Sequence, residues 1–485
     1  MLTSKDTQEL SELKSILENK SHSGKTAVDY FHKLRPHQLL KDIFPAKSSG
    51  YAVGILFMLL LLLPFFGSLS IYSFLNGIFG VVLAAKKDTY YRVLNNPWIN
   101  WRLLLLRFAK AFRGQRVKKE QLKQGLESTP SCFIVDDTDL GKTGRHFEGI
   151  SRIWSHVFGR HLFGFKCLVL GFWDGLSFIP LDFSLHNERG KKKNYGMSRK
   201  QRQERFSKER SADSQGAKRK KELRHKKTQQ VLKMIKRAVK HGIVARYVLV
   251  DSWFMNEGLI SEILSIKEGA MDVAGGCRMD KRQYKWGAGS YTAAQLKRKL
   301  KSKKKRLRKY NLTYIEQQVS YKGIPVKLFF CRMGKRGKWK LFLTTDLALS
   351  LEAFIKIYEI RWSIEVFFRE CKQHLGLAKQ QSVDFDAQIA DTTLVFIRYI
   401  LLSLYKQKHQ YQTIGALFKK TEEELLVMGL AQKIWALIKR IIRVLVEVLD
   451  VEIDLDKMMR RLISREEYYH WLQLVFSTPL NRGRN

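Results

Sequence analysis

The order of strand and helix signals between residues 131 and 250 most constrains the fold of this chain. Apolar stretches rich in β-branched and aromatic residues predict strands at 131–135, 165–173, 176–185 and 245–250. An Asp-Gly pair at 174–175 predicts a tight hairpin, and helical apolar spacing predicts a helix at 231–239. Three antiparallel strands, a helix and a fourth strand beside the first together predict an α/β fold with a central sheet.

The net charge indicates what such a fold binds. The 485 residues carry 88 Lys and Arg against 45 Asp and Glu, a formal charge of +43. This excess attracts polyanions, so nucleic acid is the first partner to consider and an anionic membrane surface the second. Two clusters concentrate the charge. Residues 189–227 hold 17 Lys and Arg and 4 Asp and Glu, which predicts a mobile loop, and residues 297–309 hold 10 Lys and Arg.

The predicted order of three antiparallel strands, a helix and a fourth strand beside the first resembles the ribonuclease-H-like fold. The regions around this predicted sheet differ in pattern. We expect helices at 10–17, 91–108, 351–377, 394–404 and 434–449, and paired strands at 325–331 and 339–345 across a glycine turn. The expected domains are a helical DNA-binding region, a first part of the catalytic core, a β-rich insertion, a core helix and a C-terminal helical, dimerising region: 1–125, 126–270, 271–347, 348–380 and 381–485.

One uncharged segment, residues 48–85, raises the question of a membrane. Its apolar run, 52–66, is shorter than the roughly 20 residues of a membrane helix, and Pro64 interrupts it. We therefore predict a buried helical core segment and regard a membrane partner as improbable, with a membrane anchor as the alternative. The five cysteines include no CxxC pair, which argues against a zinc site or a disulfide framework and favours a reducing compartment.

Three acidic residues lie where the predicted sheet could unite them. Asp137 follows the first strand, Asp251 follows the fourth, and Glu365 lies on the helix predicted at 351–377. Mg²⁺ prefers carboxylates, water and phosphate oxygens, and a pair of metal ions can activate a water or a 3′-hydroxyl and stabilise a leaving oxygen. The alternative is that each acid is a helix cap or a surface charge.

The predicted helix carries a more specific pattern. Tyr358, Arg361, Glu365 and Lys372 fall within about 60° of one another on a helical wheel, beside the apolar face. Glu365 can bind metal, whereas Arg361 and Lys372 can hold phosphates, Arg361 in bidentate fashion. Tyr358 can donate to a phosphate or stack. The alternative is an amphipathic helix with ion pairs along one side.

These four residues resemble the YREK signature of DDE transposases of the insertion-sequence-four group. Asp137 resembles the first catalytic aspartate of that family, and Asp251, in Val-Asp-Ser-Trp, resembles the second. Asp136 directly precedes Asp137; we choose Asp137 because the family keeps the aspartate before a threonine. The resemblance covers residues 131–377 by motif and extends more weakly to the N-terminal helices.

The resemblance implies a ribonuclease-H-like core and Mg²⁺-dependent cut-and-paste transposition, with two ions and Mn²⁺ as a substitute. It implies cleavage at inverted-repeat ends, a DNA hairpin, attack of a 3′-OH on target DNA, and a homodimer in the synaptic complex. The protein would be bacterial, cytoplasmic and nucleoid-associated. In relatives an insertion tryptophan receives a flipped base; we prefer Trp286 for this role and expect Trp339 to pack in its strand.

Other functions explain part of the pattern. A catalytically inactive DNA-binding derivative would share the charge and the fold. A membrane-associated basic protein would rest on residues 52–66 alone, and it would leave the stripe on the helix without a role. A two-metal nuclease without strand transfer would use the same acids, and target joining would separate it from a transposase.

Overall fold

The computed structural model describes residues 36–44, 51, 53–66, 70–76, 85–114, 129–409 and 413–419. The chain divides into two compact units: residues 1–115 with 370–485, and residues 116–369. The helices predicted at 10–17 and 434–449 lie outside the described residues. Each unit is described here by itself, and the five domain boundaries expected from the sequence stay a prediction.

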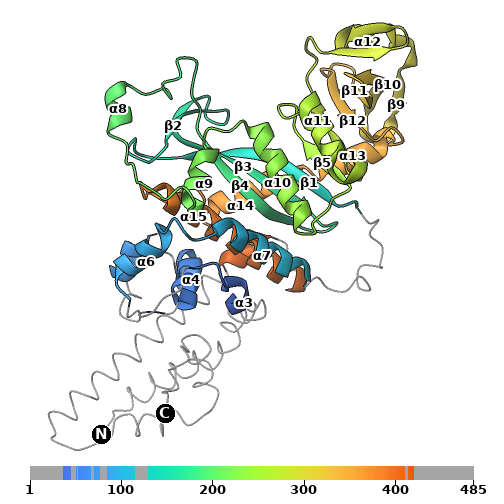
Figure 1. The fold of residues 1–485 in the computed structure, drawn as a ribbon. Helices are drawn as coiled ribbons and strands as arrows, with labels where there is room; N and C mark the ends of the chain where they lie inside the picture. The colour runs from blue at the N-terminus through green and yellow to red at the C-terminus, as the bar shows by residue number, and fades with distance from the viewer. Residues whose placement is uncertain are drawn as a thin grey trace, which may run out of the picture. The chain divides into compact units, whose positions relative to one another are not determined.

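The first unit is helical in its described part (Figure 1). Its elements are α3 (Pro36–Leu40), α4 (Val53–Leu62), η1 (Leu63–Phe66), α5 (Ile71–Asn76), α6 (Lys87–Leu94), α7 (Trp101–Gly114) and α15 (Phe385–His409). The single helix predicted at 91–108 is wrong, because the chain leaves helical conformation between α6 and α7. Pro97, which lacks an N–H and restricts the residue before it, lies in that break.

The apolar run predicted to be a core helix forms α4 and η1. Leu56, Phe57 and Leu61 are fully buried. The buried guanidinium of Arg398 on α15 donates to the backbone oxygens of Leu60 and Leu61, both at 2.7 Å. These carbonyls belong to the last turn of α4, which has no partners for them within the helix. Burial lowers the pKa of Arg398 to about 10.

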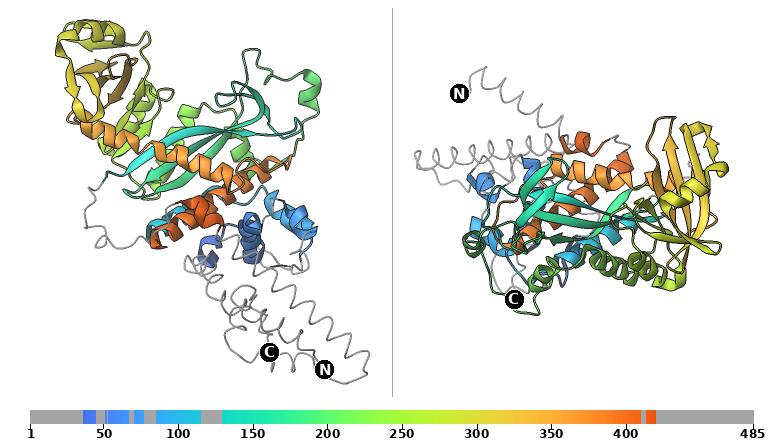
Figure 2. Two further views of the ribbon diagram at one scale, coloured as in Figure 1. Left: turned by 180° about the vertical axis from the view of Figure 1, so that it is seen from behind. Right: turned by 90° about the horizontal axis from the view of Figure 1, so that it is seen from above.

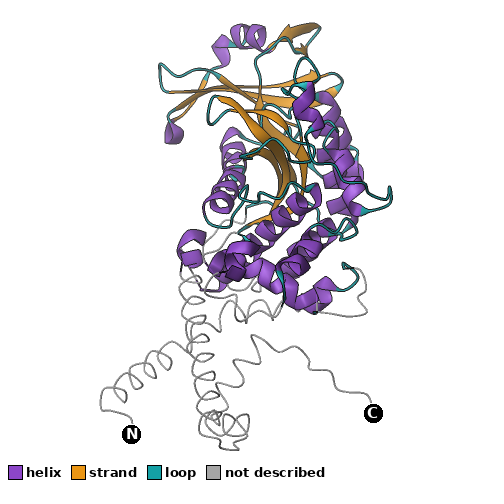
Figure 3. Cartoon of the chain, turned by 90° about the vertical axis from the view of Figure 1, so that its left-hand side faces the viewer, coloured by secondary structure: helices purple, strands orange, loops and turns teal. Residues whose placement is uncertain are grey.

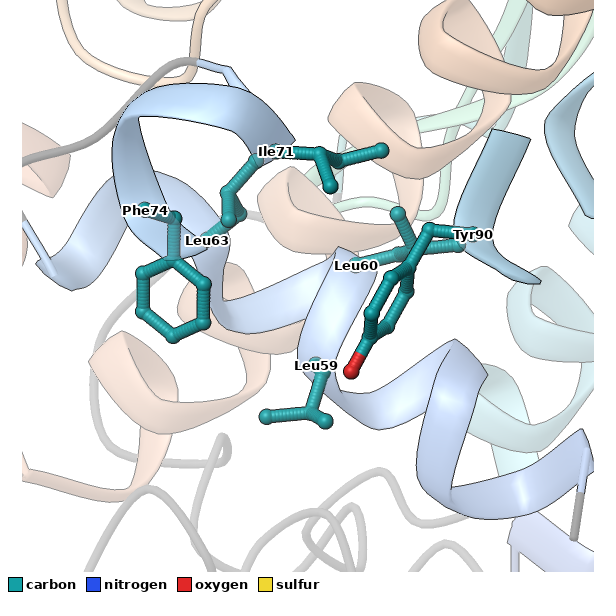
Figure 4. Close-up of a pocket in the computed structure, with 6 residues that line it drawn as sticks. All are labelled: Leu59, Leu60, Leu63, Ile71, Phe74 and Tyr90. Carbon is teal, nitrogen blue, oxygen red and sulfur yellow. The ribbon is translucent and has the colours of Figure 1, made fainter. Parts of the chain in front are cut away.

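Apolar packing dominates the rest of this unit. A small pocket is lined by apolar and aromatic side chains (Figure 4): Leu59, Leu60, Leu63, Ile71, Phe74 and Tyr90. Burial raises the pKa of Tyr90 to about 12. Within the described part of the chain, one segment, Phe385–Leu404 in α15, is long and apolar enough to cross a membrane, and 89% of its apolar window is buried inside the protein.

The second unit is built on one large sheet, visible as a twisted layer in Figure 3. Its strands are β1 (Cys132–Gly141), β2 (Ser151–Ser155), β3 (Arg160–Trp173), β4 (Phe178–His186), β5 (Tyr247–Val250), β6 (Asp272–Cys277), β7 (Gln283–Trp286), β8 (Gly289–Thr292), β9 (Lys305–Leu307), β10 (Leu312–Tyr321), β11 (Ile324–Met333) and β12 (Lys340–Thr344). The main path runs β2-β3-β1-β5-β6-β12-β11-β10-β7-β8; β4 pairs with β3 and β9 with β10.

The core of this sheet confirms the predicted ribonuclease-H-like arrangement. β3 lies antiparallel to β1 and β4, and β5 lies parallel to β1 on its other side. The Asp-Gly hairpin is also confirmed: Asp174 Oδ1 accepts from the N–H groups of Leu176 and Ser177, and Gly175 has φ of 101°. The β11–β12 pair confirms the predicted strands around 334–337.

Helices cover both faces of this core. α10 (Lys227–Lys240) contacts β3 and β4 on one face, while α14 (Trp362–Gln373) lies on the opposite face (Figure 2, left). The Phe367 ring of α14 packs 5.0 Å from the Phe178 ring of β4. Because both faces are covered, β4 is buried along its whole length.

The basic block at 189–227 is ordered, so the predicted mobile loop is wrong. It contains α8 (Arg199–Gln203) and α9 (Gln215–Glu222), the latter capped by the hydroxyl of Ser214. Arg210 forms a two-bond ion pair with Glu148, with both side chains only 2% exposed, and Lys220 donates to the same carboxylate at 2.6 Å. Acids outside the block thus neutralise part of its charge and fix its course.

The remaining elements of the second unit correct two further expectations. They are α11 (Glu257–Leu264), η4 (Ile266–Gly269), α12 (Ala293–Lys299), η5 (Lys301–Lys303), η6 (Arg308–Tyr310) and α13 (Leu351–Glu359). The helix predicted at 351–377 is two helices, α13 and α14, joined by a turn at 360–361. Trp339 lies just before β12 and is half-buried between the cations of Lys297 and Arg332, so it does not pack within the strand.

Candidate active site

The register of β1 against β5 decides which acids share a face. Cys132 lies level with Tyr247 and Ile134 with Leu249, so the same register continued places Asp136 level with Asp251. β1 extends to Gly141, whereas β5 ends one residue before Asp251. The aspartates at 136 and 137 therefore lie inside a strand and not at its end, and successive side chains of a strand point to opposite faces.

Asp136 lies on the α14 face with Glu365. Arg361, in the turn before α14, donates from one nitrogen to Asp136 Oδ2 at 3.0 Å and from the other to Glu365 Oε1 at 2.6 Å. Burial, with the nearby charges of Asp251 and Asp137, raises the pKa of Asp136 to about 7, although Arg361 and the Asp137 N–H oppose the rise. One guanidinium thus joins two predicted metal-binding regions that are 229 residues apart in the sequence.

Asp251 occupies the beginning of the loop after β5. Its Oδ1 accepts from the N–H groups of Trp253 at 2.9 Å and Phe254 at 3.2 Å, which fixes the carboxylate against its own loop. Its charge acts on both Asp136 and Tyr358. The structure therefore brings Asp136, Asp251 and, through Arg361, Glu365 on α14 into one electrostatic cluster.

Asp137 belongs to a different cluster. The Lys227 ammonium, at the beginning of α10, forms an ion pair with Asp137 Oδ2 and lies 5.3 Å from the centre of the Trp253 ring. The buried His186 ring lies 2.7 Å from the Ser184 hydroxyl, and burial followed by the charge of Lys227 lowers the pKa of His186 to about 4. The aspartate chosen from the sequence thus faces α10, and its neighbour faces Glu365.

Tyr358, on α13, and Arg361, in the turn before α14, adjoin the acids, as their spacing predicts. The Tyr358 ring stacks on Phe354 at 5.6 Å, and Arg361 lies 5.6 Å from the centre of the Tyr358 ring. A Cβ on Gly276 would lie 3.3 Å from the Tyr358 hydroxyl, so the glycine lets the phenol approach the β6 backbone. Burial raises the pKa of Tyr358. Lys372 lies in the last turn of α14, seven residues beyond Glu365.

The carboxylates fit a divalent metal by chemistry and charge. Within the described residues, no group of three or more His, Cys, Asp or Glu side chains already converges as a metal site. The Arg361 guanidinium supplies the positive charge between Asp136 and Glu365. Carboxylate oxygens are the ligands that Mg²⁺ prefers. A bound cation would also reduce the repulsion between the negative charges of Asp136 and Asp251.

The insertion holds a second cluster in which aromatic rings and cations alternate. Trp286 on β7 is half-buried, with its ring 6.2 Å from Tyr291 and the Lys303 ammonium 5.7 Å from its centre. Lys299 lies over Tyr291 in the same way. Aromatic rings can stack on bases while the cations beside them contact phosphates. The surroundings of Trp286 therefore suit a base-stacking residue, and its role in stacking stays a prediction.

Some residues of the site have no strong local signal in the sequence. Asp136 could be preferred over Asp137 as the acid beside Glu365 only if the register of β1 against β5 were known. Lys227 is one of 17 Lys and Arg in its block, and nothing in the sequence marks it as the partner of Asp137. Trp253 is an exposed aromatic residue two positions after Asp251, and its place beside Lys227, the partner of Asp137, emerges only from the fold.

The fold and the acids are consistent with a class of protein, the nucleases that have a ribonuclease-H-like α/β core. The family model described as DDE superfamily endonuclease matches residues 81–317, just under half of the chain, including Asp136, Asp137 and Asp251. This match supports a DDE transposase-like family with nuclease or transposase activity; that superfamily generally uses divalent metal ions, and DNA is the substrate it implies. No curated protein matches the chain.

Proposed function

We propose that the chain is a DDE transposase that cleaves DNA at the ends of its element and joins them to target DNA. The observation that carries this proposal is the Arg361 bridge from Asp136 to Glu365, beside Asp251. The tyrosine, arginine and glutamate of the YREK pattern all take part in this cluster, which supports the insertion-sequence-four resemblance over an amphipathic helix with incidental ion pairs.

In this proposal Asp136 takes the place that the sequence pattern assigns to Asp137. Two observations support the exchange. The register of β1 against β5, continued by two residues, places Asp136 level with Asp251, and Asp136 contacts the same guanidinium as Glu365. Asp137 pairs with Lys227 on the α10 face. Its role is to hold α10 against β1, with no part in the chemistry.

Asp136, Asp251 and Glu365 would hold two Mg²⁺ ions, with Mn²⁺ as a substitute. Such ions activate a water or a 3′-hydroxyl and stabilise the leaving oxygen. The side chains around them have their own tasks. Arg361, in the turn before α14, presents a fork that matches a phosphate, and Lys372, in the last turn of α14, adds a point charge. The stacked ring of Tyr358 positions its hydroxyl and supports Arg361.

The remaining features follow from the YREK resemblance and are part of the proposal. They are cut-and-paste excision with a DNA hairpin, a homodimer that holds two inverted-repeat ends, base stacking on Trp286, and a place in the bacterial cytoplasm at the nucleoid. The high positive charge supports binding to DNA ends and target DNA alike.

The test uses a plasmid that carries the native flanks of the gene, incubated with the full chain and Mg²⁺ or Mn²⁺. Four variants are compared: Asp136→Asn, Asp251→Asn, Glu365→Gln and, as the matched control, Asp137→Asn. We expect flank cleavage to fall at least about 1000-fold in the first three, a loss of about 4 kcal/mol of transition-state stabilisation. The control should stay within about threefold of the wild type, and band shifts at fixed salt should show DNA binding by all four.

Each other outcome has a definite meaning. Loss of cleavage in Asp137→Asn with activity in Asp136→Asn would restore the assignment made from the sequence. Binding without cleavage by the wild type in either metal would identify an inactive DNA-binding derivative. Cleavage without joining of the flanks to target DNA would identify a two-metal nuclease.

A further inference from the structure

The hairpin formed by β2 and β3 has an exposed apolar tip. Ser155 of β2 pairs with Arg160 of β3, and the turn between them contains Val157, which is 84% exposed, and Phe158, which is 64% exposed. Gly159 has φ of 58°, a left-handed conformation that closes this turn. Water is an unfavourable environment for two large adjacent apolar side chains, so their position requires an explanation.

The hairpin is firmly built below its tip. Ile153 and Ser155 are buried, and the Trp154 N–H donates to Glu188 Oε2 at 2.9 Å. The Arg152 N–H donates to the backbone oxygen of Tyr195 at 3.0 Å, which ties β2 to the basic block just before α8 (Figure 1). The exposure of the tip is therefore a property of an ordered, two-stranded ribbon.

The charge around the tip selects the kind of partner. The sequence contains no Asp or Glu between 149 and 173, whereas Arg152, His156, Arg160 and His161 are all exposed on the hairpin. The block tied to its base adds the exposed lysines 191–193. An apolar protein surface would gain nothing from the positive charges of these arginines and lysines, and a polyanion would neutralise them.

Aromatic rings accompany the cations along the ribbon. The Trp154 ring packs edge-on against His161 at 5.0 Å and remains partly exposed, and the Arg152 guanidinium lies 4.7 Å from the centre of the Phe163 ring. Rings that alternate with cations suit bases that alternate with phosphates. A two-stranded ribbon also has the width that the major groove of duplex DNA admits.

We propose that the β2–β3 hairpin is a DNA-contacting element whose tip, Val157 and Phe158, is placed against the bases of duplex DNA. Arg152 and Arg160 hold the phosphates on either side. The apolar tip then leaves water on binding, and the cations release counterions. This inference rests on the proposed function, since it assumes DNA as the substrate, and it adds a contact that the acids and the YREK residues do not provide.

The first experiment places a photocrosslinker at the tip. Phe158 is replaced by p-benzoylphenylalanine in the full chain; in the matched control the same group replaces Leu176, which is 39% exposed in the β3–β4 turn. The two turns lie at opposite ends of β3, about 45 Å apart at 3.3 Å per residue over its 14 residues. With a labelled duplex of the native flanking sequence, we expect crosslinking at 158, displaced by unlabelled DNA, and little at 176.

The second experiment measures affinity for the same duplex without metal, so that cleavage plays no part. The double variant Val157→Ser with Phe158→Ser should bind about tenfold more weakly, equivalent to about 1.4 kcal/mol. Leu176→Ser should stay within about twofold of the wild type. In the crosslinking experiment, vesicles of anionic phospholipid in place of DNA should crosslink to neither residue 158 nor residue 176.

The outcomes separate the two proposals. DNA binding with equal crosslinking at 158 and 176, or unchanged affinity in the double variant, would overturn the hairpin contact and leave the transposase proposal standing. Crosslinking of residue 158 to vesicles and not to DNA would show that the tip meets a membrane. Absence of DNA binding by the wild type would overturn both proposals.

Discussion

The buried ion pair that orders the basic block gives a quantitative prediction. Replacing Glu148 by Gln removes a charge whose carboxylate accepts two bonds from Arg210 and one from Lys220, at 2.6 to 2.8 Å. Breaking one partner of a buried pair typically costs about 3–5 kcal/mol, because the other charge stays buried. We therefore expect Glu148→Gln to destabilise the local structure of residues 189–227 by about 3 kcal/mol.

The pKa of Glu148 gives a similar value for the stabilisation that its ion pairs provide. Burial alone raises this pKa, but the bonds from Arg210 and Lys220 lower it from 4.5 to about 2. A shift of that size corresponds to about 3 kcal/mol at 1.36 kcal/mol per unit. Because the pKa in the folded state is the lower one, this stabilisation is complete above pH 4.5 and is lost as the pH falls towards 2.

Trypsin is a direct probe, since the block holds 17 Lys and Arg. When opening is fast relative to cleavage, proteolysis follows the population of the open form, so 3 kcal/mol raises the cleavage rate about 100-fold. Glu209→Gln, at an exposed site in the same block, is the matched control and should cleave at the wild-type rate. Equal cleavage of Glu148→Gln and the wild type would refute the reasoning.

Three further predictions follow from single contacts. Gly276→Ala should lower DNA cleavage about tenfold by crowding the Tyr358 hydroxyl; cleavage at the wild-type rate would contradict the 3.3 Å approach. Arg398→Met should lower the free energy of unfolding by about 3 kcal/mol in denaturant titrations, because it leaves three buried carbonyls without a donor. Lys227→Met should keep cleavage within about threefold, since the proposal gives its partner Asp137 no catalytic task; a loss as large as that of Asp136→Asn would return Asp137 to the site.

The sequence by itself determined the elements of the core and their order. Alternating and continuous apolar runs identify four of its strands, and the Asp174–Gly175 turn joins two of them, because these signals depend on residues close together in the chain. Arg361 and Glu365 are four residues apart, so their ion pair also follows from local spacing. The apolar residues Val53–Phe66 are helical for the same local reason.

Only the tertiary structure decided which aspartate joins Glu365. Asp136 and Asp137 are adjacent, and a shift of one residue in strand register exchanges the faces that they occupy. The pairing of β1 with β5, 115 residues away, sets that register. The ordering of the basic block is likewise decided by a distant residue, Glu148. Local patterns determine which elements form, whereas long-range pairing and burial determine which charges meet.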